Sequence, residues 1–471
     1  MDTDLADFAV TFARKNGCEY AEARMEHAES DAYLLKNGIP QISGFDETTG
    51  MGVRFLHQGA LGFFSSNALT RTHLREGILN AIRKTKAALP LASKVSFAEE
   101  KAYQKTYRVR QRRPFADVSP EDKLAELTSI DKALKQSKAN VISSFFELSD
   151  TIHSKYLVTS DGARIRSEIP RVSFFYMMTI QEGGRSNQRY WENANVGGFE
   201  AVKRWNLAET LQSEAEALRK NLLDGRKAPS QKLDVVVGPQ IAGIMAHEAS
   251  GHPMEADRIL GREAAQAGES FITQDMQGTR IGSDAVSVVD DPTLENTYGY
   301  FLYDDEGVKA RKKYLYKKGI IDEFLHNKET AALMGVKSNG SSRASAYDRE
   351  PLLRMSNTFI EPGTYAKDEL FEDIKLGVYM KNFTEWNIDD RRFQQKYVGA
   401  ECYLIKDGRL TDQAVFGPAL EITTPQLYGS IDACGKDLEY HPGNCGKGEP
   451  MQGIPVTLGG PSVRIRNLRL N

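Results

Sequence analysis

The chain has 471 residues, of which 40% are hydrophobic and 27% charged, so it is long enough to form more than one buried core. Its 61 basic and 64 acidic residues leave a formal net charge of −3, which gives no reason to expect a nucleic-acid or anionic-membrane partner. No apolar run approaches the roughly 18 residues that a membrane-spanning helix needs.

The start of the chain predicts an amphipathic helix that ends at Gly17. Acidic residues stand where a secretory signal would carry basic ones, so we expect a cytoplasmic protein. Four cysteines are too few for a disulfide framework in a chain of this length, and they lie far apart, at Cys18, Cys402, Cys434 and Cys445.

Residues 1–225 predict an N-terminal α/β domain with antiparallel sheets and helices. Residues 52–66 are typical of two strands joined by a turn at Gln58-Gly59, and residues 140–183 are rich in β-branched and aromatic side chains, which predicts several antiparallel strands. Helical spacing of apolar residues predicts helices at 71–89, 121–136 and 207–223.

A polar stretch at 224–232 contains Gly225 and Pro229 and predicts a linker. Beyond it we expect a second domain, residues 226–471, which is mostly β around one long helix. That helix should follow a short buried strand at 234–237 and a turn at Gly238-Pro239. The predicted fold class is therefore α+β.

The predicted helix carries the sequence H-E-A-S-G-H at 247–252. Two histidines four residues apart share one helix face and can share one metal ion. His247 and His252 are five residues apart, so on an ideal helix their side chains would diverge by about 140°.

The residues that flank His252 offer a remedy for this spacing. Pro253 lacks the N–H that would bond to the carbonyl of Ala249, and it disfavours helical angles at His252. Gly251 tolerates almost any backbone conformation. We therefore predict that the helix loosens near this point, and that a one-residue bulge brings the two imidazoles within about 40° of each other.

Two carboxylates accompany the histidines. Glu248 falls on the same helix face as Ile241, Ile244 and Met245, where a carboxylate is costly unless it is paired or takes part in chemistry. Glu255 follows His252 by three residues and could hydrogen-bond a ligating imidazole.

A catalytic zinc site normally takes three protein ligands and keeps one position open. Cys434 and Cys445 are each followed by Gly-Lys, and a nearby lysine favours the thiolate. Glu255, His326 and His441 are further candidates for the third ligand. Spacing alone does not choose among them.

The chain resembles the TldD/PmbA family of metallopeptidases, and specifically the motif-containing TldD-type subunit. The resemblance is clear over about 230–471 and weaker over 1–225. Besides the histidine motif, it rests on D-V-V-V-G-P at 234–239, Y-D-D-E-G at 303–307, S-N-G-S-S-R-A-S-A-Y at 338–347, R-M-S-N-T at 354–358 and N-C-G-K-G-E-P-M-Q-G-I-P-V at 444–456.

This resemblance implies one zinc ion per chain, bound by His247, His252 and Cys445. It implies hydrolysis of unstructured peptides, with Glu248 as the general base that activates a metal-bound water. Two residues of the 338–347 segment, Arg343 and Tyr347, are candidates for oxyanion stabilisation or substrate contact, and Glu255 for support of a ligand. The acids at 304–306 are expected to form a solvated turn.

The family resemblance also implies that the N-terminal domain encloses the substrate in a dimer cavity. The partner would be a second copy or a motif-less subunit of the PmbA/TldE type. One alternative is a non-enzymatic gyrase or toxin modulator with a structural metal, which would need Cys434, His441 or Glu255 as a fourth ligand. A metal-dependent hydrolase of non-peptide substrates is another.

Overall fold

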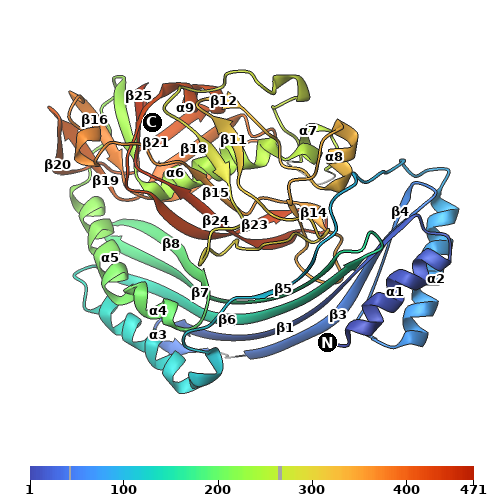
Figure 1. The fold of residues 1–471 in the computed structure, drawn as a ribbon. Coiled ribbons are helices and arrows are strands. Elements are labelled where there is room, and N and C mark those ends of the chain that lie inside the picture. Colours follow the sequence, from blue (N-terminus) through green and yellow to red (C-terminus); the bar gives the residue numbers. More distant parts are fainter. Residues whose placement is uncertain (42–43, 264–267) are drawn as a thin grey trace.

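The computed structural model describes residues 1–41, 44–263 and 268–471. It confirms an α+β protein, in which a long N-terminal sheet curves beneath the C-terminal half of the chain (Figure 1). Within the described ranges, no helix combines the length and the apolar character that crossing a membrane requires.

The N-terminal half is built on one eight-stranded sheet with the order β4-β3-β1-β6-β7-β5, in which β2 pairs with β1 and β8 pairs with β7. Its strands are β1 (Tyr20–Lys36), β2 (Ile39–Pro40), β3 (Gly44–His57), β4 (Ala60–Ser66), β5 (Gln104–Arg108), β6 (Val141–Thr159), β7 (Arg164–Glu182) and β8 (Arg185–Val196).

The strand-rich stretch at 140–183 forms two long strands rather than several short ones. Gly162, with φ +101°, lies in the turn between β6 and β7, as its position in the sequence suggests. Pro170, however, lies inside β7. β5 pairs with β7 as far as Glu168, and β8 pairs with β7 from Arg171 onward. Pro170 lies between these two pairings, so no neighbouring strand on that edge requires the N–H that proline lacks.

Helices cover the outer face of this sheet at both ends (Figure 1). Alternate residues of β7 pack against them, including Phe174 and Tyr176, and the Tyr176 hydroxyl donates to Glu214 of the last helix. The opposite, concave face of β7 faces the C-terminal half of the chain. The helices are α1 (Thr3–Lys15) and α2 (Arg71–Ala88) at one end, and α3 (Pro120–Lys135), α4 (Glu200–Arg204) and α5 (Leu207–Asp224) at the other.

The C-terminal half contains two six-stranded sheets. The first has the order β12 (Ile320–Ile321), β11 (Lys313–Lys317), β10 (Val288–Asp290), β15 (Asn357–Ile360), β24 (Gln452–Gly460) and β23 (Glu439–Lys447). The second has the order β20 (Arg409–Ala414), β19 (Cys402–Lys406), β16 (Leu376–Met380), β9 (Leu233–Val237), β25 (Val463–Leu468) and β22 (Ile431–Cys434).

Smaller elements complete this half. A three-stranded sheet joins β17 (Phe383–Ile388), β18 (Gln394–Gly399) and β21 (Ala419–Thr423), and a short ladder joins β13 (Ser342–Arg343) to β14 (Leu352–Leu353). The short helices are α7 (Ala256–Ile259), α8 (Lys328–Met334) and α9 (Thr424–Ser430), and 3-10 turns lie at Phe115–Asp117, Gln274–Met276 and Asp368–Leu370.

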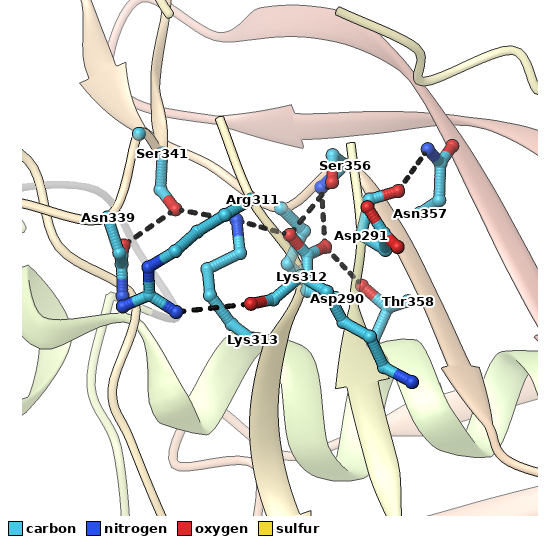
Figure 2. Close-up of polar contacts among 12 residues, drawn as sticks. Asp290, Asp291, Arg311, Lys312, Lys313, Asn339, Ser341, Ser356, Asn357 and Thr358 are labelled. Carbon is cyan, nitrogen blue, oxygen red and sulfur yellow. Dashed lines mark hydrogen bonds and ion pairs between the residues drawn. The ribbon is translucent and has the colours of Figure 1, made fainter. Parts of the chain in front are cut away.

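A buried ion pair fastens the centre of the first C-terminal sheet (Figure 2). Lys313 Nζ of β11 lies 2.8 Å from Asp290 Oδ1 of β10, and both side chains are fully buried. Ser356 and Thr358 donate to the same carboxylate, and Lys313 also donates to Ser341 Oγ. Burial alone would raise the pKa of Asp290, but Lys313 and the hydrogen bonds from Ser356 lower it. The R-M-S-N-T stretch thus has a structural role in this network.

Two acids of the Y-D-D-E-G stretch join the two halves of the chain and the third is buried with them, so the prediction of a solvated turn is wrong. Asp304, Asp305 and Glu306 are all buried. Arg54 Nη2 of β3 lies 2.7 Å from Glu306, and Lys155 Nζ of β6 lies 2.5 Å from Asp305. Each acid reaches a partner that is distant in the sequence, which hydropathy alone could not reveal.

Candidate metal centre

The histidine motif lies at the end of a fully buried helix, α6 (Pro239–Ala246), which follows β9 directly. This helix packs closely on β24: a Cβ at Gly243 would lie 2.9 Å from the backbone nitrogen of Gly459. The α-helical part ends at Ala246 and is followed by a π-helical turn over His247–Gly251 and a 3-10 turn over His252–Met254.

The π-helical turn is the predicted one-residue bulge. The N–H of His252 bonds to the carbonyl of His247, five residues earlier, so the second histidine stacks above the first as an i+4 residue does in an α-helix. The predicted loss of helical angles at His252 is wrong, since its φ and ψ are −61° and −45°. Gly251 has an ordinary φ of −58°, and a Cβ there would lie 1.8 Å from Met355 Sδ, so close packing requires the glycine.

Two tyrosine hydroxyls hold the turn. Tyr316 donates to the carbonyl of Ala249 over 3.1 Å, the acceptor that Pro253 cannot serve. Tyr428 donates to the carbonyl of Met245 over 3.1 Å and lies 2.5 Å from Ser250 Oγ. The irregular backbone is therefore satisfied from two other elements of the C-terminal half.

Three side chains of types that commonly bind metal ions meet at this turn. One ligand atom each from His247, His252 and Cys445 lies within 4.8 Å of the other two, and all three residues are buried. The imidazole centroids are 4.9 Å apart, and Cys445 Sγ lies 3.5 Å from His252 Nε2. Cys445 comes from β23, which pairs with β24, the strand on which α6 packs. In the sequence it follows the two histidines by nearly two hundred residues.

The electrostatics of the cluster suit a divalent cation. Burial lowers the pKa of His247, which favours the neutral imidazole, and its Nδ1 is buried with no hydrogen-bond partner among the described residues. Burial alone would raise the pKa of the Cys445 thiol, but His252 and Arg354 bring it to about 7. Two neutral imidazoles and a thiolate are a donor set that zinc accepts.

Glu248 lies beside this cluster, with Oε2 at 3.9 Å from His252 Nε2. Its Oε1 accepts from Trp386 Nε1 at 3.3 Å, and its Oε2 accepts from Arg392 Nη1 at 3.0 Å. Burial alone would raise the pKa of Glu248, but the two histidines and Arg392 lower it. Trp386 and Arg392 come from β17 and the turn after it, and no spacing in the sequence connects them to the motif.

Glu255 contacts His252, one of the candidate ligands. Its Oε2 lies 3.0 Å from His252 Nδ1 and accepts from Arg258 at 2.6 Å. Lys447, in the C-G-K stretch, lies 3.3 Å from Glu255 and 2.7 Å from Asp257. This lysine therefore anchors the carboxylates around the site, rather than contacting the sulfur as its position next to Cys445 had indicated.

The other candidates for a third ligand lie outside the three-residue group. Cys434 Sγ contacts the carbonyl of Ala285 at 3.4 Å, His326 Nδ1 contacts Thr330, and His441 Nε2 lies 3.4 Å from Glu439. Among the described residues, no fourth side chain joins the group.

Arg343 and Tyr347 are not brought to the cluster. Arg343 donates to the carbonyl of Met355 over 2.9 Å, and the Tyr347 ring lies against Gly50 of β3, where a Cβ would be 2.2 Å away. Both line a different pocket, between the two halves of the chain. A role for either in stabilising the oxyanion remains a prediction.

A cavity of about 390 Å³ adjoins the cluster, with His247, Glu248, His252 and Cys445 in its wall. The N-terminal sheet closes its other side, through Phe175, Tyr190, Trp191 and Glu192. The candidate site is therefore lined by both halves of the chain, although its ligand atoms come from the C-terminal half alone.

Three family models of PmbA/TldA metallopeptidases match this chain: domain 1 at 21–89, the central domain at 113–219 and the C-terminal domain at 230–471. The chain belongs to this family. This confirms the resemblance drawn from its motifs, and it makes the chain a metallopeptidase. Relatives include a metalloprotease of Methanocaldococcus jannaschii, 34% identical with 95% of this chain and 96% of the relative covered.

Other matches extend along the whole chain. A zinc metalloprotease TldD homolog of Saccharolobus solfataricus is 23% identical, with 97% of this chain and 98% of that protein covered. Among solved structures, TldE from Thermococcus kodakarensis is similar with a TM-score of 0.78 at 15% identity, with 99% of both chains covered. At that identity the structural match shows a shared fold.

Proposed function

We propose that the chain is a zinc-dependent peptidase that hydrolyses unstructured peptides, with His247, His252 and Cys445 as the ligands of one zinc ion and Glu248 as the general base. The observation that carries this proposal is the convergence of three buried donor atoms within 4.8 Å at a cavity that also exposes Glu248. The name of the Saccharolobus solfataricus relative supports the choice of metal.

A zinc ion held by His247, His252 and Cys445 would supply a lowered pKa for a water molecule and polarisation of a peptide carbonyl. Glu248 then has to accept a proton and return it to the departing amine. Trp386 and Arg392 each hold one carboxylate oxygen, which fixes its direction beside the cluster. The positive charge of Arg392, 3.0 Å from Oε2, lowers the pKa of Glu248 and so favours the ionised carboxylate before the proton arrives.

The three-donor group favours catalysis over a purely structural metal. A structural zinc site usually takes four protein ligands, and the described residues supply three. Cys434 and His441, two of the alternatives for the fourth, are engaged elsewhere. The Oε2 atom of Glu255 contacts His252 Nδ1, Arg258 and Lys447. One coordination position is thus left for water or substrate.

The preference for unstructured peptides follows from the strand that carries Cys445. β23 is the last strand of its sheet, and its residues Pro442–Gly446 line the cavity. An extended peptide can pair with such an edge through its main chain, which tolerates many side chains and excludes folded proteins.

The assignment of Glu248 is tested by Glu248→Gln. We expect this variant to keep its zinc, measured by metal analysis, and to cleave a fluorogenic unstructured peptide roughly 100- to 10,000-fold more slowly. Glu385→Gln, on the exposed part of β17, is the matched control and should cleave normally. Normal activity of Glu248→Gln would show that another residue is the base.

We further propose that residues 1–225 enclose the substrate and residues 226–471 carry the catalytic residues, in a cytoplasmic dimer. The partner would be a second copy or a motif-less subunit of the TldE type, which the fold match to TldE supports. Size-exclusion chromatography with light scattering on the isolated chain tests this point, and an active monomer would contradict an obligate dimer.

A further inference from the structure

A second pocket lies between the concave face of the N-terminal sheet and the C-terminal half. It has a volume of about 250 Å³, and we name it the arginine pocket after Arg171 on β7 and Arg343 on β13. Tyr298, Phe301 and Ser345 complete the wall around these two side chains. None of these five residues belongs to the metal-site cavity.

Neither arginine forms an ion pair with an acid among the described residues. Arg343 is 7% exposed; its Nη1 donates to the carbonyl of Met355, and its guanidinium lies 5.1 Å from the Phe301 ring centroid. Arg171 donates to the carbonyls of Tyr298 and Tyr300 at 3.2 and 3.5 Å. Burial lowers the pKa of both, and for Arg343, at about 9, the charge of Arg171 adds to the effect. A buried Arg343 beside a half-buried Arg171, neither in an ion pair with an acid, is a costly arrangement, and an anion between them would offset part of that cost.

The acids that share the pocket are already engaged. Glu26 pairs with Arg24 and lies 3.0 Å from His153. Asp305 pairs with Lys155 and accepts the N–H of Ala344 at 2.8 Å. The third acid, Asp304, accepts three backbone N–H groups, from Glu306, Val308 and Ser342. The charge of Asp305 raises the pKa of both arginines, but none of the three acids forms an ion pair with either of them.

The distance to the metal-site cavity can be measured along β7. Arg171 lines the arginine pocket and Phe175 lines the metal-site cavity, and since the two are four residues apart their side chains lie on the same face of the strand. Four residues of strand span roughly 13 Å. Between the two pockets, the side chain of Tyr298 bonds to Ser173 and Asn444.

We propose that the arginine pocket binds a carboxylate of the substrate peptide, about four extended residues away from the metal-site cavity. The carboxylate would accept hydrogen bonds from the guanidinium groups of Arg171 and Arg343. Among the described residues, Nη1 of Arg171 and Nη2 of Arg343 have no hydrogen-bond partner. This inference rests on the proposed function, because it assumes a peptide substrate. The bound carboxylate is either the C-terminal carboxylate of the peptide or an acidic side chain near that end.

The test measures binding without cleavage. A fluorescein-labelled hexapeptide of alanine and serine, with a free C-terminal carboxylate, and its C-terminal amide are titrated into the metal-free protein, and fluorescence anisotropy gives both values of Kd. Removal of the metal prevents hydrolysis and also prevents a carboxylate from binding zinc. We expect the amide to bind roughly ten- to a hundredfold more weakly than the acid, as loss of hydrogen bonds to charged groups predicts.

The two arginines are then replaced separately, as Arg343→Met and Arg171→Met. The amide-to-acid ratio of Kd should fall toward one in each variant, and this ratio does not depend on the fraction of protein that is folded. Arg311→Met is the control, because Arg311 is exposed and its guanidinium pairs with Glu323 outside the pocket. Amidated peptides that end in Glu or Gln distinguish the sources: tighter binding of the Glu peptide identifies an acidic side chain as a ligand.

The outcomes separate this inference from the proposed function. Equal binding of acid and amide, together with equal binding of the Glu and Gln peptides, would overturn the carboxylate site while leaving the peptidase intact. Preference for the acid that survives in both arginine variants would overturn it as well. If none of the peptides bound, the result would contradict the proposed peptide substrate itself, and the carboxylate site with it.

Discussion

The chain contains the tripeptide Cys-Gly-Lys twice, at 434–436 and at 445–447, and the two copies differ in almost every physical respect. Cys434 ends β22, and burial raises the pKa of its thiol to about 12. Cys445 is as deeply buried, but His252 and Arg354 outweigh the effect of burial and its pKa is about 7. Identical local sequence thus yields an inert thiol in one sheet and a candidate ligand in the other.

The lysines diverge in the same way. Lys436 is exposed, and its ammonium makes no ion pair among the described residues. Lys447 is buried and lies within 3.3 Å of Glu255 and 2.7 Å of Asp257. The comparison teaches that the motif acquires its chemistry from what β23 places beside it, which is the π-helical turn and the carboxylates that follow that turn.

The largest expected difference between the copies is in metal binding. Mutation of a residue that hydrogen-bonds a metal ligand typically lowers metal affinity by roughly 10- to 100-fold. Loss of a ligand itself should therefore lower zinc affinity by more than about a hundredfold. We therefore expect Cys445→Ser to lose its zinc during dialysis, while Cys434→Ser retains it, as measured by inductively coupled plasma mass spectrometry. If both variants kept stoichiometric zinc, Cys445 would not be a ligand.

A second contrast concerns the lysines and the stability of the fold. Lys447→Met leaves Glu255 and Asp257 without their shared cation in a buried site, where breaking an ion pair costs about 3 kcal/mol. Lys436→Met should change the free energy of unfolding by less than about 0.5 kcal/mol, as exposed substitutions usually do. Urea denaturation of the metal-free proteins measures both values, and similar midpoints would refute the anchoring role of Lys447.

A smaller effect is expected at the carboxylate that Lys447 holds. Glu255→Gln keeps the shape but weakens the hydrogen bond that orients His252, so zinc affinity should fall by roughly tenfold. Glu439→Gln is the matched control, because that carboxylate contacts His441 outside the three-residue group. Competition with a zinc chelator gives the two affinities, and an unchanged value for Glu255→Gln would limit its role to packing.

Much of the site could be predicted from local sequence. A bulge that corrects the five-residue spacing of the histidines follows from helix geometry and from the proline, because both act within two turns of one helix. The reason for Gly251 could not be predicted in this way: the glycine makes room for Met355, a hundred residues later. The partners of Glu248 were also missed, since Trp386 and Arg392 reach it from a hairpin with no recognisable pattern.

By itself, the sequence determined the α+β class, the family and a helix that breaks where its two histidines must meet. These depend on periodicity, on backbone chemistry and on motifs, all of which are written along the chain. Only the tertiary structure decided which cysteine approaches those histidines, why the acids at 304–306 are buried and where Arg343 lies. Each of these depends on side chains that meet although their segments lie far apart in the sequence, and a contact of that kind leaves no periodic trace in either partner.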